Sequence, residues 1–167
     1  MRAALRACDL SPGIVVRWCT REYSGLVGME LIAKEMTMAD IDDLKATFEQ
    51  VVAAICRRDA AAYSNFWHEQ IVAFPPTSPF AIEGKATLRP MAEANFAQAE
   101  SVTFSPINPQ CRVIGSTGIV WGHTALTRKP KDGPLTTLFA RFTFIFAKTD
   151  AGWREVAVHV SQIPTVG

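Results

Sequence analysis

The sequence has a balanced charge and no long apolar run, and both features exclude classes of protein. Among 167 residues, 17 Lys and Arg stand against 16 Asp and Glu, a formal net charge of +1. No block of basic residues is present, so a nucleic acid partner, which needs clustered Lys and Arg, is not expected. No apolar segment approaches the roughly 20 residues that span a bilayer, so a membrane partner is not expected either.

The sequence also lacks paired cysteines and the motifs of common cofactor sites. Its cysteines, Cys8, Cys19, Cys56 and Cys111, are widely spaced, and no C-x-x-C or paired His spacing occurs. Neither a zinc site nor a disulfide framework is indicated, and we expect no metal or other cofactor. There is no Gly-rich phosphate loop and no nucleophile motif. The only apolar run near the N-terminus, residues 14–16, is too short for a signal peptide, so we expect a cytoplasmic protein.

The chain divides into two parts of different character. Residues 1–37 show no sustained helical or strand period, and we interpret them as an irregular N-terminal extension. Residues 38–167 have the length and pattern of a single domain. Lys34 and Glu35 can be encoded by a purine run typical of ribosome-binding sites. Our hypothesis is therefore that Met38 is the natural start, and N-terminal sequencing of native protein would test it.

Helical signals come first in the domain. Asp40 is a good N-cap for a helix that ends near Arg57 and carries one apolar stripe: Ile41, Leu44, Phe48, Val51, Val52 and Ile55. Asp59 can cap a second helix, from Ala60 to about His68. A short strand over 70–74 and a third helix over about 87–99 follow.

Strand-like segments then continue to the end of the chain. They cover residues 102–107, 111–114, 119–128, 135–149 and 153–161, with turn residues between them. Helices followed by a run of hairpins predict the α+β class. We expect a curved antiparallel sheet wrapped around about three N-terminal helices.

The last two strands carry the residues of a known family. An Arg-x-Thr strand, a turn, a Trp and a His-x-Ser, at Arg141, Thr143, Trp153, His159 and Ser161, resemble the SnoaL-like proteins of the nuclear transport factor 2-like (NTF2-like) superfamily. Upstream, "FWHEQIVAFPP", a glycine and "KATLRPMAEANF" are similar to the short strand and third helix of that family. The resemblance spans about residues 40–164. It implies a cone with a pocket at its open end, and a dimer packed through the outer sheet face.

Side-chain alternation predicts which residues lie on that outer face. The Val residues at 156, 158 and 160 share one face of the last strand, and Phe142, Phe144 and Phe146 share one face of the strand before it. These apolar faces should turn toward the helices. The outer face would then hold Trp121, His123, Arg141, Thr143, Trp153, Glu155 and His159. We expect Trp121, His123, Arg141 and His159 to form a homodimer interface.

The catalytic residues remain unknown from the sequence. We expect His159 to have an interface or structural role, and an exposed position or a catalytic role are the alternatives. Glu83, in the loop before the third helix, is the best-placed free carboxylate. Where ketosteroid isomerase-like relatives imply a carboxylate, this chain has Phe74. Where the related kinase hub domain implies arginines, it has Thr124, Phe144 and Val160, so the resemblance does not favour a small anionic ligand.

The expected pocket is apolar. Candidates for its wall are Tyr63, Trp67, Phe74, Met91, Phe96, Thr124, Phe142, Phe144 and Val160, although each could simply fill the core. Tyr63 and Trp67, at i and i+4, would share a helix face at the pocket mouth. We expect a protein that binds a small hydrophobic molecule, with metal-free isomerase, cyclase or dehydratase chemistry, or a non-catalytic dimerisation or scaffold domain. A buried ionisable residue at the pocket would favour the enzyme.

Overall fold

The computed structural model describes residues 30–164, with side chains described from Met38 onward. Its elements are α1 (Glu30–Cys56), α2 (Ala60–Ser64), β1 (Trp67–Phe74), β2 (Ile82–Glu83), α3 (Lys85–Ala97), β3 (Ala99–Ile114), β4 (Thr117–Pro130), β5 (Thr136–Thr149) and β6 (Gly152–Gln162). The predicted α+β class is confirmed.

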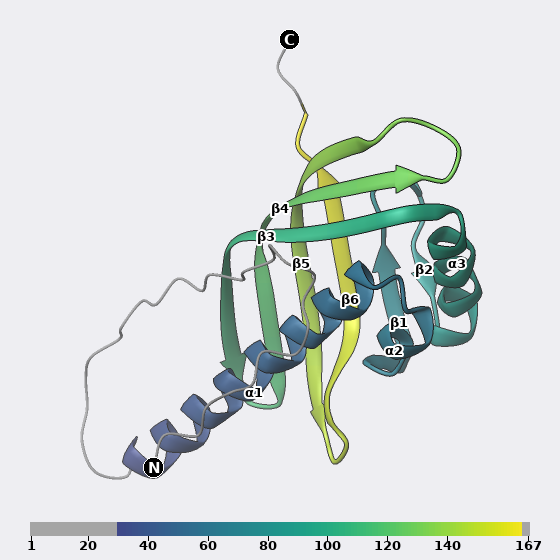
Figure 1. Ribbon diagram of the computed structural model, residues 1–167. Helices are drawn as coiled ribbons and strands as arrows, with labels where there is room; N and C mark the ends of the chain where they lie inside the picture. The colour runs from purple at the N-terminus through teal and green to yellow at the C-terminus, as the bar shows by residue number, and fades with distance from the viewer. Residues whose placement is uncertain (1–29, 165–167) are drawn as a thin grey trace.

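The strands form one curved sheet in the order β2-β1-β6-β5-β4-β3. Long hairpins join β3 to β6, and α1 lies across the concave side of the sheet (Figure 1). α2, α3 and β2 gather at the other end of that side. The expectation of an antiparallel sheet needs one correction, because β1 runs parallel to β6. The connection from β1 to β6 passes through the rest of the sheet, so these two neighbours are not constrained to form a hairpin.

The first helix begins earlier than the sequence predicted. α1 starts at Glu30, so Asp40 is an interior residue and not the N-cap. The segment Glu-Leu-Ile-Ala-Lys-Glu-Met that precedes it consists mostly of strong helix formers, which explains the extension into the segment expected to be irregular. The Asp40 carboxylate instead pairs with the Lys148 ammonium group of β5. The predicted Met38 start remains a prediction.

The second helix ends earlier than predicted. Its N-cap is confirmed, since the Asp59 carboxylate accepts a hydrogen bond of 2.9 Å from the Ala62 backbone N–H. The helix stops at Ser64, however, and Trp67 begins β1. The main-chain carbonyl of Phe66 accepts a 2.7 Å hydrogen bond from the Glu155 N–H of β6. Pairing with β6 therefore overrides the helical pattern of "AAAYSNFWH", as tertiary context often does.

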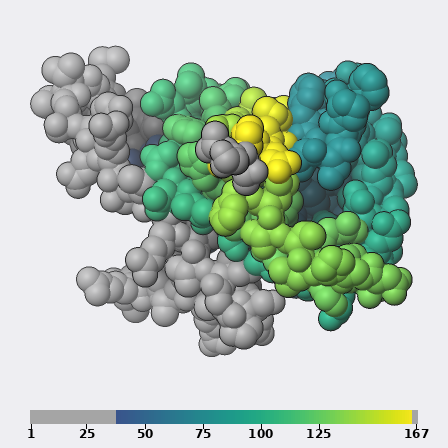
Figure 2. Space-filling model, turned by 90° about the horizontal axis from the view of Figure 1, so that it is seen from above, coloured from purple at the N-terminus to yellow at the C-terminus, as the bar shows by residue number. Residues whose placement is uncertain are grey.

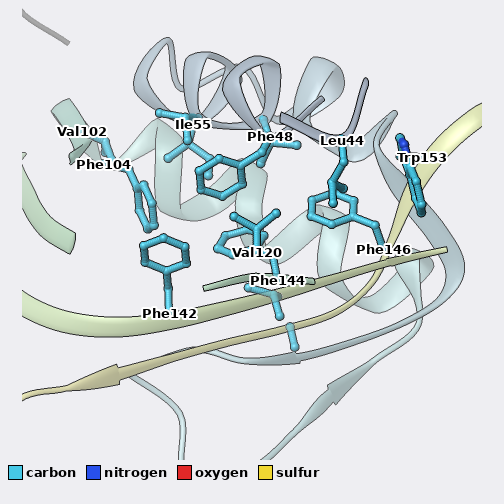
Figure 3. Close-up of a cluster of buried hydrophobic side chains, with 14 of the residues drawn as sticks. Leu44, Phe48, Ile55, Val102, Phe104, Val120, Phe142, Phe144, Phe146 and Trp153 are labelled. Atoms are coloured by element: carbon cyan, nitrogen blue, oxygen red, sulfur yellow. The ribbon is translucent and has the colours of Figure 1, made fainter. Parts of the chain in front are cut away.

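The apolar stripe of α1 packs onto the sheet as expected. Phe48 stacks on Phe142 at a ring-centroid distance of 5.6 Å and meets Phe144 edge-on at 5.4 Å. Figure 3 shows these rings between the helix and the strands, with Leu44 and Trp153 at one end of the cluster. Close approach of the helix depends on Gly118, because a Cβ there would lie 2.8 Å from both Leu44 methyl groups.

Two β-bulges change the expected strands. The segments predicted at 102–107 and 111–114 are one strand, β3, whose register shifts between Ile107 and Gln110. In β6 the pairing with β5 shifts so that Phe146 opposes Glu155 and Ile145 opposes Ala157, which leaves Val156 as the extra residue. A bulge reverses the alternation of side chains beyond it. The prediction that Trp153 and Glu155 lie on the outer face with His159 is therefore wrong, since both are buried.

Candidate functional site

A cavity of about 450 Å³ lies between the concave side of the sheet and the segment that contains α2, β1, β2 and α3. Figure 2 shows a hollow between the green surface of the β4–β5 hairpin and the teal surface around α3. The lining comprises Ile55, Tyr63, Trp67, Ala73, Phe74, Pro75, Pro76, Thr77, Ser78, Ile82, Leu88, Met91, Ala92, Asn95, Phe96, Val102, Phe104, Leu126, Arg128, Phe144, Val158 and Val160. A cavity of this size and character suits a small, largely apolar molecule.

Most residues predicted for the pocket wall border this cavity. They are Tyr63, Trp67, Phe74, Met91, Phe96, Phe144 and Val160. Thr124 and Phe142 are not part of the lining. The Thr124 side chain is fully buried and its hydroxyl donates a 3.0 Å hydrogen bond to the Ser105 carbonyl. Phe142 packs between Phe48 and Phe104 in the core.

A buried carboxyl group stands behind the cavity wall. Glu155 has 0 % of its surface exposed, and the Tyr63 hydroxyl lies 3.5 Å from its Oε1 atom, a long hydrogen bond in which the phenol donates. Tyr63 lines the cavity and its ring meets the indole of Trp67 edge-on at 4.7 Å. Tyr63 and Glu155 thus form a pair, with the phenol at the cavity and the carboxyl group behind it.

Burial changes the proton affinity of both members of this pair. Desolvation raises the pKa of the Glu155 carboxyl well above its usual 4.5, although the hydrogen bond from Tyr63 opposes the shift. Desolvation also raises the pKa of the Tyr63 hydroxyl well above its usual 10.0, and the negative charge on Glu155 adds to the shift. The pair therefore favours its fully protonated form, in which both groups can donate a hydrogen bond.

Three buried side-chain atoms have no hydrogen-bond partner within the described residues: Trp67 Nε1, Trp153 Nε1 and Glu155 Oε2. A buried, unsatisfied carboxyl oxygen is expensive and uncommon in a structural core. Sequence reasoning missed Glu155 because strict alternation placed it on the outer face. An acidic residue flanked by a Trp and three valines was the available signal for an irregularity in this strand.

The candidates named from the sequence lie elsewhere. His159 and Glu83 are exposed, and neither belongs to the cavity lining. His159 lies on the outer side of the sheet, and its ring meets that of Phe74 edge-on at 6.0 Å. Phe74 is the last residue of β1 and contacts both this ring and the cavity. Trp121, His123 and Arg141 are on the outer side too, where Trp121 opposes Thr143 and His123 opposes Arg141 in the strand pairing. The four predicted interface residues thus share one face.

The part of the chain that the structure describes holds neither a metal-binding cluster nor a membrane-spanning helix. There, no group of three or more His, Cys, Asp or Glu side chains is arranged to hold a metal ion. None of the helices there combines the length and the apolar character that crossing a membrane requires.

A curved sheet closed by N-terminal helices around an apolar cavity defines the NTF2-like class of α+β proteins, also described as cystatin-like. Residues 44–165 match the SnoaL-like domain, and the chain belongs to that family. The predicted resemblance is confirmed. Among proteins with curated functions, none matches the sequence.

Solved structures of several proteins share the fold at low sequence identity. A provisionally assigned dehydratase of the NTF2-like family from Streptomyces avermitilis is 19% identical, with a TM-score of 0.70 over 76% of this chain and 98% of that one. A provisionally assigned aromatic ring hydroxylase from Novosphingobium aromaticivorans is 17% identical, with a TM-score of 0.70 over 78% and 93%. The CamKII hub homology domain of Chlamydomonas reinhardtii is 20% identical, with a TM-score of 0.61 over 74% and 98%. At this identity the likeness establishes the fold alone.

Proposed function

We propose that this protein binds a small, largely apolar molecule in its cavity and transfers a proton to or from an oxygen atom of that molecule. The observation that carries the proposal is the Tyr63–Glu155 pair, which presents a phenol to an apolar cavity with a fully buried carboxyl group behind it. A perturbed ionisable pair at a cavity is a recognised mark of a catalytic site. One similar structure is named as a dehydratase, and dehydration requires proton transfer to an oxygen atom.

The chemistry follows from the position of the two groups. The Tyr63 hydroxyl can donate a hydrogen bond to a carbonyl or hydroxyl oxygen of the bound molecule and stabilise negative charge that develops there. Protonated Glu155 can in turn donate to the phenol oxygen and stabilise it as its own proton moves to the ligand. Isomerisation, cyclisation and dehydration each need such a proton donor. In this arrangement Tyr63 is the catalytic residue and Glu155 is a positioning residue.

Native mass spectrometry of the purified protein, followed by isotope exchange, tests the proposal. We expect the protein to retain a small apolar molecule. In D₂O, the hydrogen bond from Tyr63 to a carbonyl oxygen of that molecule should speed deuterium incorporation at the adjacent carbon atoms. Solvent water is the base that removes the carbon-bound proton, and Tyr63 stabilises the negative charge on the enolate oxygen. Tyr63→Phe, which keeps the ring, should retain binding and lower the exchange rate by about 10²-fold or more. Exchange at the uncatalysed rate with the wild-type protein would contradict proton transfer. Ligand binding would then be the only part of the proposal that stands.

A non-catalytic dimerisation or scaffold role is the second candidate, and the outer sheet face favours it. Trp121, His123, Arg141 and His159 share this face with Phe139, whose surface is 58% exposed. Aromatic and Arg side chains such as these are enriched at protein interfaces. Two similar structures are described as a CamKII hub homology domain and a CamKII association domain. We propose that a second copy of the chain packs here.

Light scattering tests the dimer. Trp121→Glu should convert dimers to monomers, because it places a charge in the middle of the proposed interface. Ala46→Glu, which adds the same charge at an exposed position of α1 on the opposite side of the sheet, is the control and should leave the mass unchanged. A monomeric wild-type protein, or a dimer that survives Trp121→Glu, would contradict this interface.

A further inference from the structure

The cavity lining carries one cation and no anion. Among the described residues that line the cavity, Arg128 is the only Lys or Arg, and none is Asp, Glu or His. A single guanidinium group on an otherwise uncharged wall makes the cavity selective for ligand charge, because no carboxylate of the lining offsets its attraction to an anion. Arg128 is not one of the positions at which the resemblance to the hub domain implied arginines, which are Thr124, Phe144 and Val160.

The guanidinium group of Arg128 has unused hydrogen-bonding capacity. Its Nη2 atom donates a 3.3 Å hydrogen bond to the Asn95 main-chain carbonyl near the end of α3. Arginine has five N–H donors, so this contact leaves most of them for another group. Within the described residues no carboxylate lies within 4.0 Å of Arg128, whereas the next residue, Lys129, is paired with Glu100 at 2.6 Å.

We infer that the ligand is an amphipathic carboxylic acid, with an apolar body inside the cavity and a carboxylate bound by Arg128 at its edge. The inference rests on the proposed function and names its ligand class. The planar fork of arginine matches the two oxygens of a carboxylate, which favours this anion over a point-like one. The remaining lining is mostly apolar, includes Phe104, Leu126 and Phe144, and suits an aromatic or branched body.

A matched pair of probes tests the inference by isothermal titration calorimetry at pH 7 and low salt. Biphenyl-4-carboxylate and biphenyl-4-carboxamide have the same shape and differ in charge. We expect the wild-type protein to bind the carboxylate about 10-fold more tightly than the amide, since a hydrogen bond to a charged group contributes at least that factor. This preference should fall as salt is added, because ions screen the pair.

Arg128→Gln should abolish the preference by weakening the carboxylate about 10-fold while leaving the amide unchanged. Arg112→Gln removes an exposed charge away from the cavity and is the matched control, which should behave as the wild type. Equal binding of the two probes, or a carboxylate affinity that Arg128→Gln does not alter, would overturn the inference and leave the cavity proposal intact. Failure of both probes to bind the wild-type protein would overturn the cavity proposal and the inference with it.

Discussion

The two ends of the interior use the same sheet in different ways. Under α1, the side chains of Leu44, Phe48, Val51 and Val52 are fully buried against β3 to β6. Under α3, no residue of the helix is buried, although Leu88, Met91 and Phe96 are apolar and face the cavity. Both helices carry apolar residues toward the sheet, so hydrophobicity does not distinguish them. The two helices differ in whether their aromatic rings interdigitate with rings of the strands. Under α1 they do, and this region provides stability; under α3 a cavity remains that is open to a ligand.

The largest expected effect comes from removing an aromatic ring from the packed end. Phe48→Ala should lower the free energy of unfolding by about 3–5 kcal/mol, because the ring leaves a cavity among fixed neighbours. The matched change at the open end, Phe96→Ala, should lower it by only about 1 kcal/mol, since that ring already borders empty space. Urea denaturation of both variants checks the contrast. Equal losses would mean that the two ends are packed alike.

A second change tests how closely α1 approaches the sheet. Gly118→Ala should lower the free energy of unfolding by about 1–3 kcal/mol, because the new methyl group would contact Leu44 at 2.8 Å and Trp153 at 3.2 Å. Gly115→Asn is the control, since none of the described residues lies within 4 Å of a Cβ there and Asn tolerates the positive φ of 58°. It should change stability by about 0.5 kcal/mol or less. An unchanged free energy of unfolding for Gly118→Ala would show that Leu44 and Trp153 can move to make room for the methyl group.

Sequence patterns predicted the packed end better than the open end. The stripe from Leu44 to Ile55 and the row of Phe142, Phe144 and Phe146 follow regular helix and strand periods, and both are buried as expected. Periodicity of this kind depends only on local geometry. The family resemblance added the fold and the existence of a pocket to this picture.

The open end depends on irregularities that a period cannot show. One extra residue, Val156, turns Glu155 inward while His159 stays outside, so the buried carboxyl group was assigned to the wrong face. The placement of Trp67 depends on pairing with a strand almost ninety residues later in the chain. Arg128 lies on β4, where neither composition nor spacing indicates that it reaches a cavity. Each of these positions is set by pairing between strands that are distant in the sequence, and such pairing cannot be deduced from a local sequence pattern.

The pH dependence of stability tests the buried carboxyl group at the boundary between the two ends. Because the pKa of Glu155 is raised on folding, the folded protein binds more protons than the unfolded chain above pH 4.5. Its stability should then fall with rising pH by up to about 1.4 kcal/mol per pH unit, until the raised pKa is passed. Glu155→Gln cannot ionise and should lack this decline, so the stability of the variant relative to wild type should increase with pH. Parallel curves from urea denaturation at pH 4 to 8 would show that Glu155 ionises freely.

The smallest expected effect concerns how the open end is held in place without packing. α2 has five residues and carries Tyr63, and its first turn is fixed by the hydrogen bond from the Ala62 N–H to the Asp59 carboxylate. Asp59→Ala should lower the free energy of unfolding by about 1 kcal/mol, whereas Asp59→Asn keeps an acceptor oxygen and should be nearly neutral. If the cap positions the cavity wall, Asp59→Ala should also weaken binding of biphenyl-4-carboxylate, and Asp59→Asn should not. Unchanged binding in both variants would mean that the contact of Tyr63 with Trp67 holds the wall, and that the cap contributes to stability alone.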